Sequence, residues 1–227
     1  MLAGRIRASR ETMSTFTDIT AGCPNCGTQQ ELTVARGINV ARTPAARDAI
    51  MEGRFQRYCC SGCRVEFTVL RPFTYVDWSR AQMFGVFPLA DIDEWPRCEQ
   101  VLEGTFSRTL GDESDGAPDG IPDEIRLRTV FGLDALREKL LLFDAGMDDA
   151  VVEVMKLRWV MEGGAAERRR PLVIDVVADM LVVRSEDETA VWSRADYEAL
   201  RRDEETVTPF LDVLAAGSFR DLVRFAS

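Results

Sequence analysis

Alternating apolar and polar residues predict a β-rich first half of the chain. Short runs of this kind predict strands over residues 15–20, 30–40, 55–58, 65–70, 73–78 and 83–87. A short helix interrupts them, because Thr43 suits the N-cap, Pro44 suits the first helical position and Gly53 suits the helix end. A longer apolar stripe with helical spacing, capped by Asp93, predicts a helix that ends near Leu110.

Helical and alternating patterns are mixed in the second half. They predict a strand over residues 125–131 and two amphipathic helices with ordinary core faces over 133–144 and 148–161. They also predict a β-hairpin over 172–177 and 180–184, and three short helices over 193–201, 208–215 and 219–225. Between the halves, residues 111–120 hold three glycines, one proline and four acidic residues. This composition predicts an acidic linker.

These patterns predict an α+β fold in two domains. The first is a β-rich domain with a helix insert over residues 13–110, and the second is a smaller α+β domain over residues 121–227. The sequence leaves open whether the two parts share one core. Residues 1–12 contain three arginines without a following apolar segment, so we expect a flexible tail and no signal peptide. We therefore expect a cytoplasmic protein with reduced cysteines.

Composition and charge narrow the possible functions. Hydrophobic residues make up 46 % of the chain and charged residues 29 %, as in ordinary globular proteins, and no apolar run is long enough for a membrane helix. The chain has no histidine, which excludes serine and cysteine hydrolases with a catalytic histidine, and HExxH metalloproteases. Residues 1–64 carry nine basic and five acidic residues, whereas residues 65–227 carry 19 and 33. The acidic bulk argues against nucleic-acid and membrane partners.

The chemistry of the chain is concentrated in two cysteine pairs. Cys23 and Cys26 form one CxxC motif, Cys60 and Cys63 form another, and 33 residues separate the two. Two such turns can place four thiolates around one tetrahedral ion, and zinc accepts four sulfurs at about 2.3 Å. Four sulfur ligands leave no open position, so the sequence predicts one structural zinc. Iron, unmetallated thiols or disulfides are the alternatives.

The residues that follow the two motifs differ in how well they suit the backbone of a cysteine turn. Gly27 suits the left-handed backbone that often follows such a turn, whereas Arg64 stands at the corresponding place in the second motif. Cys59 and Cys98 lie outside the two motifs. We expect both to be small core residues, Cys59 on the opposite strand face from Cys60 and Cys98 on a helix stripe.

Residues 19–88 resemble the CpXC domain, a bacterial and archaeal family with two cysteine motifs. The matching segments are Cys23-Pro24-Asn25-Cys26-Gly27, the Gly37–Val40 stretch, the helix between Thr43 and Gly53, Cys60-Ser61-Gly62-Cys63 and Pro72-Phe73-Thr74-Tyr75. The resemblance continues to about residue 160. Ser61 and Arg64 depart from the family pattern, which has proline and glycine there. The resemblance implies a bound metal and no particular activity.

Three classes of function fit these features, and non-enzymatic ones are favoured. The first is an interaction module with a protein partner, supported by the closed four-cysteine motif. The second is a redox or rubredoxin-like iron protein. The third, a zinc-ribbon nucleic-acid binder, is less favoured, since it depends on a scattered basic set near Phe55 and Tyr58: Arg36, Arg42, Arg47, Arg54, Arg57 and Arg64. A carboxylate hydrolase has little support, because Asp148, Asp149, Asp175 and Asp179 resemble helix caps and turn residues.

Overall fold

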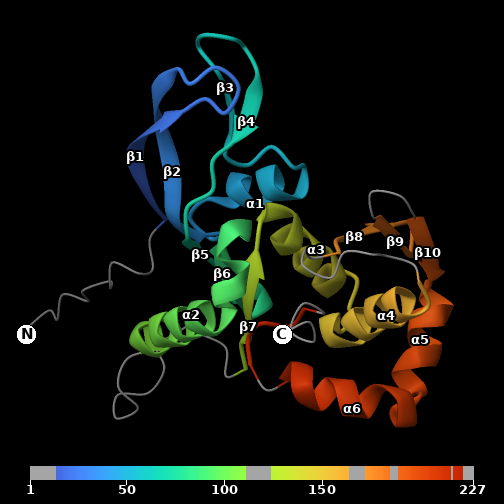
Figure 1. Ribbon diagram of the computed structural model, residues 1–227. Helices are drawn as coiled ribbons and strands as arrows, with labels where there is room; N and C mark the ends of the chain where they lie inside the picture. Colours follow the sequence, from blue (N-terminus) through green and yellow to red (C-terminus); the bar gives the residue numbers. More distant parts are fainter. Residues whose placement is uncertain (1–13, 111–123, 164–171, 185–188, 216, 222–227) are drawn as a thin grey trace, which may run out of the picture.

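The computed structural model describes residues 14–110, 124–163, 172–184, 189–215 and 217–221. The predicted tail and the predicted acidic linker lie outside these residues. Within them, the chain has the expected mixed α+β fold, with six α-helices and three sheets (Figure 1). The four cysteines of the two motifs lie together in an N-terminal β-rich region.

The largest sheet joins the two predicted parts of the chain. Its five strands have the order β1-β2-β5-β6-β7. They span Thr15–Gly22, Gln29–Asn39, Phe73–Asp77, Gln82–Phe87 and Arg126–Phe131. Strand β7 comes from the second predicted part and pairs in parallel with β6, from the first. The two parts therefore share this sheet, a point that the sequence left open.

Helices cover both faces of the sheet. They are α1, α2 and α3, over Pro44–Met51, Trp95–Leu110 and Leu133–Asp144. Because side chains of a strand alternate between faces, Phe84 of β6 packs in the core of α1 and α3, while its neighbour Met83 packs with Leu102 of α2. Gly85 permits the close approach of α2, since a Cβ atom there would lie 3.2 Å from that of Leu102.

The C-terminal elements form a second layered unit beside α3. A three-stranded sheet has the order β10-β9-β8, and three helices pack with it. The strands β8 to β10 are Ile174–Val177, Met180–Arg184 and Thr189–Ser193, and the helices α4 to α6 are Asp149–Met161, Arg194–Arg202 and Glu204–Ala215. The expected cap of α5 is confirmed, because Ser193 and Asp196 form a reciprocal capping box. None of the helices in the described parts has the length and apolar character needed to cross a bilayer.

Two local sequence predictions are wrong. Asp93 does not cap α2, because a 3-10 helix over Leu89–Glu94 precedes it and α2 begins at Trp95. The expected helix over 219–225 is absent in its described part, residues 219–221. Phe219 is instead buried against Trp95 and Phe131, and its amide donates to the Glu99 carboxylate.

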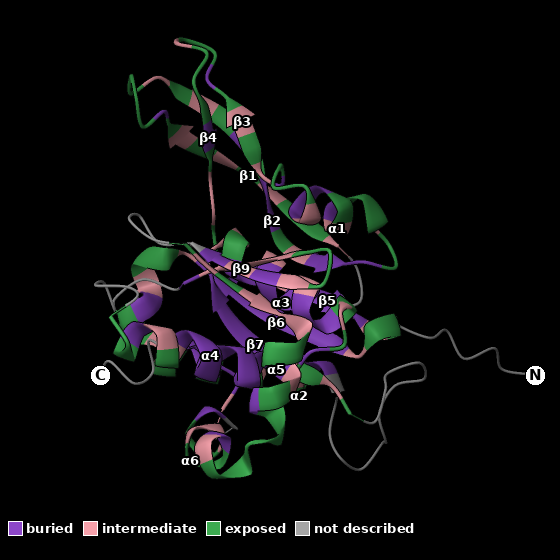
Figure 2. Cartoon of the chain, turned by 90° about the vertical axis from the view of Figure 1, so that its right-hand side faces the viewer, coloured by how far each residue is buried: buried purple, intermediate pink, exposed green. Residues whose placement is uncertain are grey.

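A small β-rich head stands apart from the main body. We define the head as residues 19–34 and 56–69, and the body as the other described residues. The head combines the outer ends of β1 and β2 with the short antiparallel strands β3 (Arg57–Cys59) and β4 (Glu66–Thr68). Figure 2 shows buried residues concentrated in the central sheet and its helices, whereas the strands of the head are mostly exposed or half-buried.

Candidate metal centre

Two tight turns at the tip of the head carry the four cysteines. The first turn begins after β1, and the second connects β3 with β4. The two turns have matching hydrogen bonds. The amide of Cys23 donates to Thr28 O at 3.0 Å and that of Gly27 to Cys23 O at 2.9 Å. The amide of Cys60 likewise donates to Val65 O at 2.9 Å and that of Arg64 to Cys60 O at 3.0 Å.

Each turn also directs a backbone amide at its first sulfur. The Asn25 amide lies 3.4 Å from Cys23 Sγ, and the Gly62 amide lies 3.4 Å from Cys60 Sγ. Such N–H donors stabilise negative charge on sulfur. The two motifs therefore form a pair of equivalent knuckles, each preorganised to hold thiolates.

The four sulfurs converge on one point. All four Sγ atoms lie within 4.8 Å of one another. The distance between Cys23 and Cys63 sulfurs is 3.7 Å, and that between Cys26 and Cys60 sulfurs is 3.6 Å. Zinc–sulfur bonds of about 2.3 Å in a tetrahedron place sulfurs about 3.8 Å apart. The cluster thus has the spacing needed to bind a metal ion with four sulfur ligands.

Contacts between the knuckles fix their relative position. A Cβ atom on Gly62 would lie 2.6 Å from the Thr28 hydroxyl oxygen, so only glycine permits this approach of the two turns. The Gln30 side chain accepts from the Ser61 amide at 3.0 Å, and its amide group lies 3.4 Å from Cys59 O. The Tyr58 hydroxyl donates to Thr33 O at 2.7 Å. These bonds hold β3 and its knuckle against β2.

The surroundings affect the four thiols differently. Burial raises the pKa of the Cys23 thiol to about 11. The hydroxyl and amide of Thr28 lower the pKa of Cys26 to about 6. Hydrogen bonds with Asn25 and with the Val65 amide also lower the pKa of Cys63. These contacts therefore shift two of the four thiols, Cys26 and Cys63, toward the thiolate form.

The other two cysteines have contrasting environments. Cys98 is buried on α2, as expected. The expectation for Cys59 is wrong, because this thiol is exposed. It lies on the face of β3 opposite Tyr58, and in the described part of the chain no element covers that face. Its sulfur contacts the carbonyl oxygen of Arg64 at 3.5 Å, outside the four-sulfur cluster.

Several residues of the predicted basic set are paired with acids. Arg57 lies 3.0 Å from Glu66, and Arg54 forms an ion pair with Glu52. Arg47 belongs to the body, where it lies 2.6 Å from Asp144. Half of the predicted basic set is therefore paired with acids.

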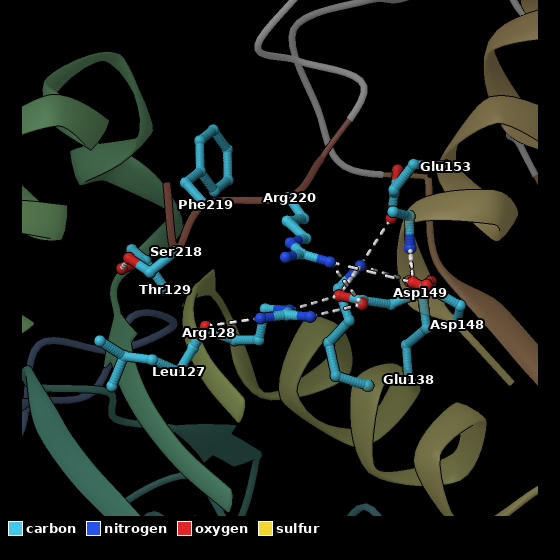
Figure 3. Close-up of polar contacts among 12 residues, drawn as sticks. Leu127, Arg128, Thr129, Glu138, Asp148, Asp149, Glu153, Ser218, Phe219 and Arg220 are labelled. Atoms are coloured by element: carbon cyan, nitrogen blue, oxygen red, sulfur yellow. Dashed lines mark hydrogen bonds and ion pairs between the residues drawn. The ribbon is translucent and has the colours of Figure 1, made fainter. Parts of the chain in front are cut away.

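A group of charged residues inside the body was not predicted from the sequence. Three basic and three acidic side chains, all buried, lie where β7, α3 and α4 meet: Arg128, Lys139, Lys156, Glu138, Asp149 and Glu153. Figure 3 labels four of them, Arg128, Glu138, Asp149 and Glu153. The chain has two lysines, and both belong to this group. A signal was present, because residues 149, 153 and 156 of α4 have the i, i+4, i+7 spacing of one helix face.

Each buried charge in this group has opposite charges beside it. Lys156 Nζ lies 2.7 Å from Glu138 and 2.9 Å from Glu153, and Lys139 Nζ lies 2.7 Å from Glu153. Arg128 donates to both oxygens of Asp149, at 2.8 and 2.9 Å. Burial opposes ionisation of Asp149, but Lys139 and Arg128 outweigh it and lower its pKa overall. We refer to these six residues as the buried ionic group.

Comparison with known proteins agrees with the cysteine geometry. The family model described as CpXC protein matches residues 21–156, which is more than half of the chain. This match covers both cysteine motifs, strands β2 to β7 and all six members of the buried ionic group. Searches among curated proteins and among solved structures gave no match. On the strength of the family match, the chain belongs to the CpXC family.

Proposed function

We propose that Cys23, Cys26, Cys60 and Cys63 bind one zinc ion, which stabilises the head as an interaction module. The observation that carries this proposal is the convergence of all four sulfurs within 4.8 Å. When bound, the ion supplies cross-linking between the two knuckles and keeps all four thiols deprotonated.

The ligand set favours a structural role for the ion. Four protein sulfurs fill a tetrahedron, whereas catalytic zinc keeps one position for water or substrate. The backbone amides aimed at Cys23 and Cys60 supply the outer hydrogen bonds that such sulfurs need. Zinc suits this set because it demands no redox change. The same four sulfurs also fit iron, which is the redox alternative.

The exposed residues of the knuckles favour a protein partner over a nucleic acid. Pro24, Asn25, Ser61 and Gly62 are exposed and uncharged. Recognition of phosphate backbones depends on lysines and arginines, and within residues 23–28 and 60–65 the knuckles carry one, Arg64. A partner that docks on the tips would contact backbone and small polar groups held in place by the metal.

Metal analysis of the purified chain tests the first part of the proposal. We expect about one zinc per chain by elemental analysis, and a colourless protein. Changing all four cysteines to serine should abolish zinc binding. The matched controls are Cys59→Ser and Cys98→Ser, which should retain the full zinc content. Stoichiometric iron and a red colour would favour the redox alternative over structural zinc. An equal loss of metal in the two control variants would contradict the assignment of the four ligands.

A charge change at the tips tests the interaction role. The Pro24→Glu, Ser61→Glu double variant keeps all four ligands and should keep its zinc. Affinity capture with the zinc-loaded chain should then recover a protein that the double variant fails to recover. Arg97→Glu on α2, which lies in the body, is the matched control. Capture of the same proteins by all three chains would contradict docking at the tips.

A further inference from the structure

A small pocket lies beside the buried ionic group, where β7, α4 and α5 meet. Its volume is about 210 Å³. Four arginines line it, namely Arg126, Arg128, Arg201 and Arg220, together with only two carboxylates. In a chain with a net charge of −10, this local excess of positive charge is unusual.

The two carboxylates of the pocket are already engaged. Asp149 accepts two hydrogen bonds from Arg128 and lies 3.6 Å from Lys139 Nζ, so its charge is compensated without the other arginines. Asp148 caps α4 by accepting a hydrogen bond from the Ala150 amide at 2.9 Å. Neither carboxylate therefore supplies a close partner for the remaining guanidinium groups.

Arg220 lies at the base of the pocket with its charge poorly compensated. Its Nη1 atom lies 3.9 Å from the nearest oxygens of Asp148 and Asp149, beyond hydrogen-bond distance (Figure 3). Its Nε atom is buried, and within the described residues it has no hydrogen-bond partner. Burial and the nearby Arg128 both lower the pKa of Arg220. A negatively charged acceptor would supply the missing hydrogen-bond partner of Arg220 and balance its charge.

Further donors surround the mouth of the pocket. Arg126 is exposed and stacks on the Phe143 ring, with 4.9 Å between the guanidinium carbon and the ring centroid. Arg201 is also exposed, on the last turn of α5, where its Nε lies 3.2 Å from the Glu198 carboxylate. The Tyr197 hydroxyl accepts the Asp148 amide hydrogen at 2.8 Å and retains its own hydrogen as a donor.

We propose that this pocket binds a small oxyanion, a phosphate group or a carboxylate, with Arg220 at its base and Arg126 and Arg201 at its mouth. Guanidinium groups match the geometry of both anions with paired N–H donors. The volume suits a phosphate ion or a short dicarboxylate and is below the range for larger ligands.

Titration calorimetry at low salt with inorganic phosphate, and separately with malonate, tests this proposal on the full chain. We expect saturable binding of one anion per chain. The tighter of the two anions identifies the class of ligand. Arg220→Gln should weaken binding tenfold or more, about the effect of one hydrogen bond to a charged group. No saturable binding of either anion would overturn the proposal.

Control variants separate a defined site from general attraction. Arg97→Gln removes one positive charge from an arginine that is 78 % exposed on α2, and should leave anion binding unchanged. Arg126→Gln and Arg201→Gln, at exposed positions, should weaken binding about threefold each even if Arg220→Gln fails to fold. An equal loss in all four variants would mean nonspecific attraction and would contradict the site. Serine substitution of the four clustered cysteines should leave anion binding intact.

Discussion

The apolar cluster of the head contains four buried side chains, whereas each of the two largest clusters of the body contains sixteen. Two of the four in the head, Cys23 and Cys60, are themselves proposed ligands. A core of this size does not offset the conformational entropy lost on folding, so small domains usually need a disulfide or a metal. The body has ample apolar burial and tolerates the six charged residues of the buried ionic group inside it. We therefore expect the head to depend on a metal ion held by the cysteine cluster, while the body depends on extended packing.

Removal of the metal should separate the two regions most sharply. With a strong chelator, the head should lose its structure, because zinc binding contributes on the order of 10 kcal/mol to such folds. Hydrogen exchange should rise across residues 19–34 and 56–69. All four tryptophans lie in the body, at positions 78, 95, 159 and 192, so their fluorescence should change little. A change in tryptophan fluorescence that accompanies the rise in hydrogen exchange would contradict the independence of the body.

The next largest effect is expected inside the body. Lys156→Met leaves Glu138 and Glu153 buried without one of their cations, and such a change costs about 3–5 kcal/mol. Urea unfolding followed by tryptophan fluorescence should shift to lower concentration, with an unchanged zinc content. Arg158→Met, at an exposed position of the same helix, is the control and should have little effect. Equal midpoints for the two variants would show that the buried ionic group does not stabilise the body.

Acid should act on the body through Asp149. Its pKa is lowered from the ordinary value of 3.8, so its stabilising effect is complete above that pH and declines as the pH falls further. We expect the wild-type body to lose about 1–3 kcal/mol between pH 5 and pH 2 from this group. Asp149→Asn should be less stable at pH 7 and should show a shallower decline. Parallel pH profiles for the two proteins would contradict this assignment.

The smallest expected effect compares the knuckles themselves. Gly27 and Arg64 occupy equivalent positions, with φ of 75° and 63°, a region that disfavours residues other than glycine. Arg64→Gly should stabilise the second knuckle by about 1 kcal/mol, seen as roughly fivefold tighter zinc in a competition assay. Gly27→Ala should weaken zinc binding by a similar factor. A weaker site in Arg64→Gly would mean that the arginine side chain itself supports the knuckle.

The sequence predicts features that depend on local residues. The spacing of the cysteines indicates the cluster, and Pro44 with Gly53 marks both ends of α1. Pairing between distant segments is not encoded locally, so the parallel pairing of β6 with β7 could not be predicted. The same limit explains why the exposure of Cys59 was not predicted. Alternation correctly placed it opposite Cys60, but no local signal tells whether another element covers that face.

The buried ionic group shows a second limit of sequence patterns. Charged residues normally indicate a solvated face of a helix. On α4, Asp149, Glu153 and Lys156 are buried because α3 and β7 provide opposite charges at matching positions. Only the three-dimensional arrangement supplies these partners. The anion pocket is missed for the same reason, since Arg126, Arg201 and Arg220 come from three separate segments.

Placement of both lysines in the interior has a practical consequence for labelling this protein. Lys139 is 3 % exposed and Lys156 is 1 % exposed, and each ammonium is held protonated by carboxylates. Acylating reagents need an accessible, neutral amine, so the folded chain should react with them at its terminal amine and leave both lysines unmodified. Opening of the body would expose two new reactive sites. The rate of lysine acylation, followed by mass spectrometry, therefore measures the rate at which the body unfolds.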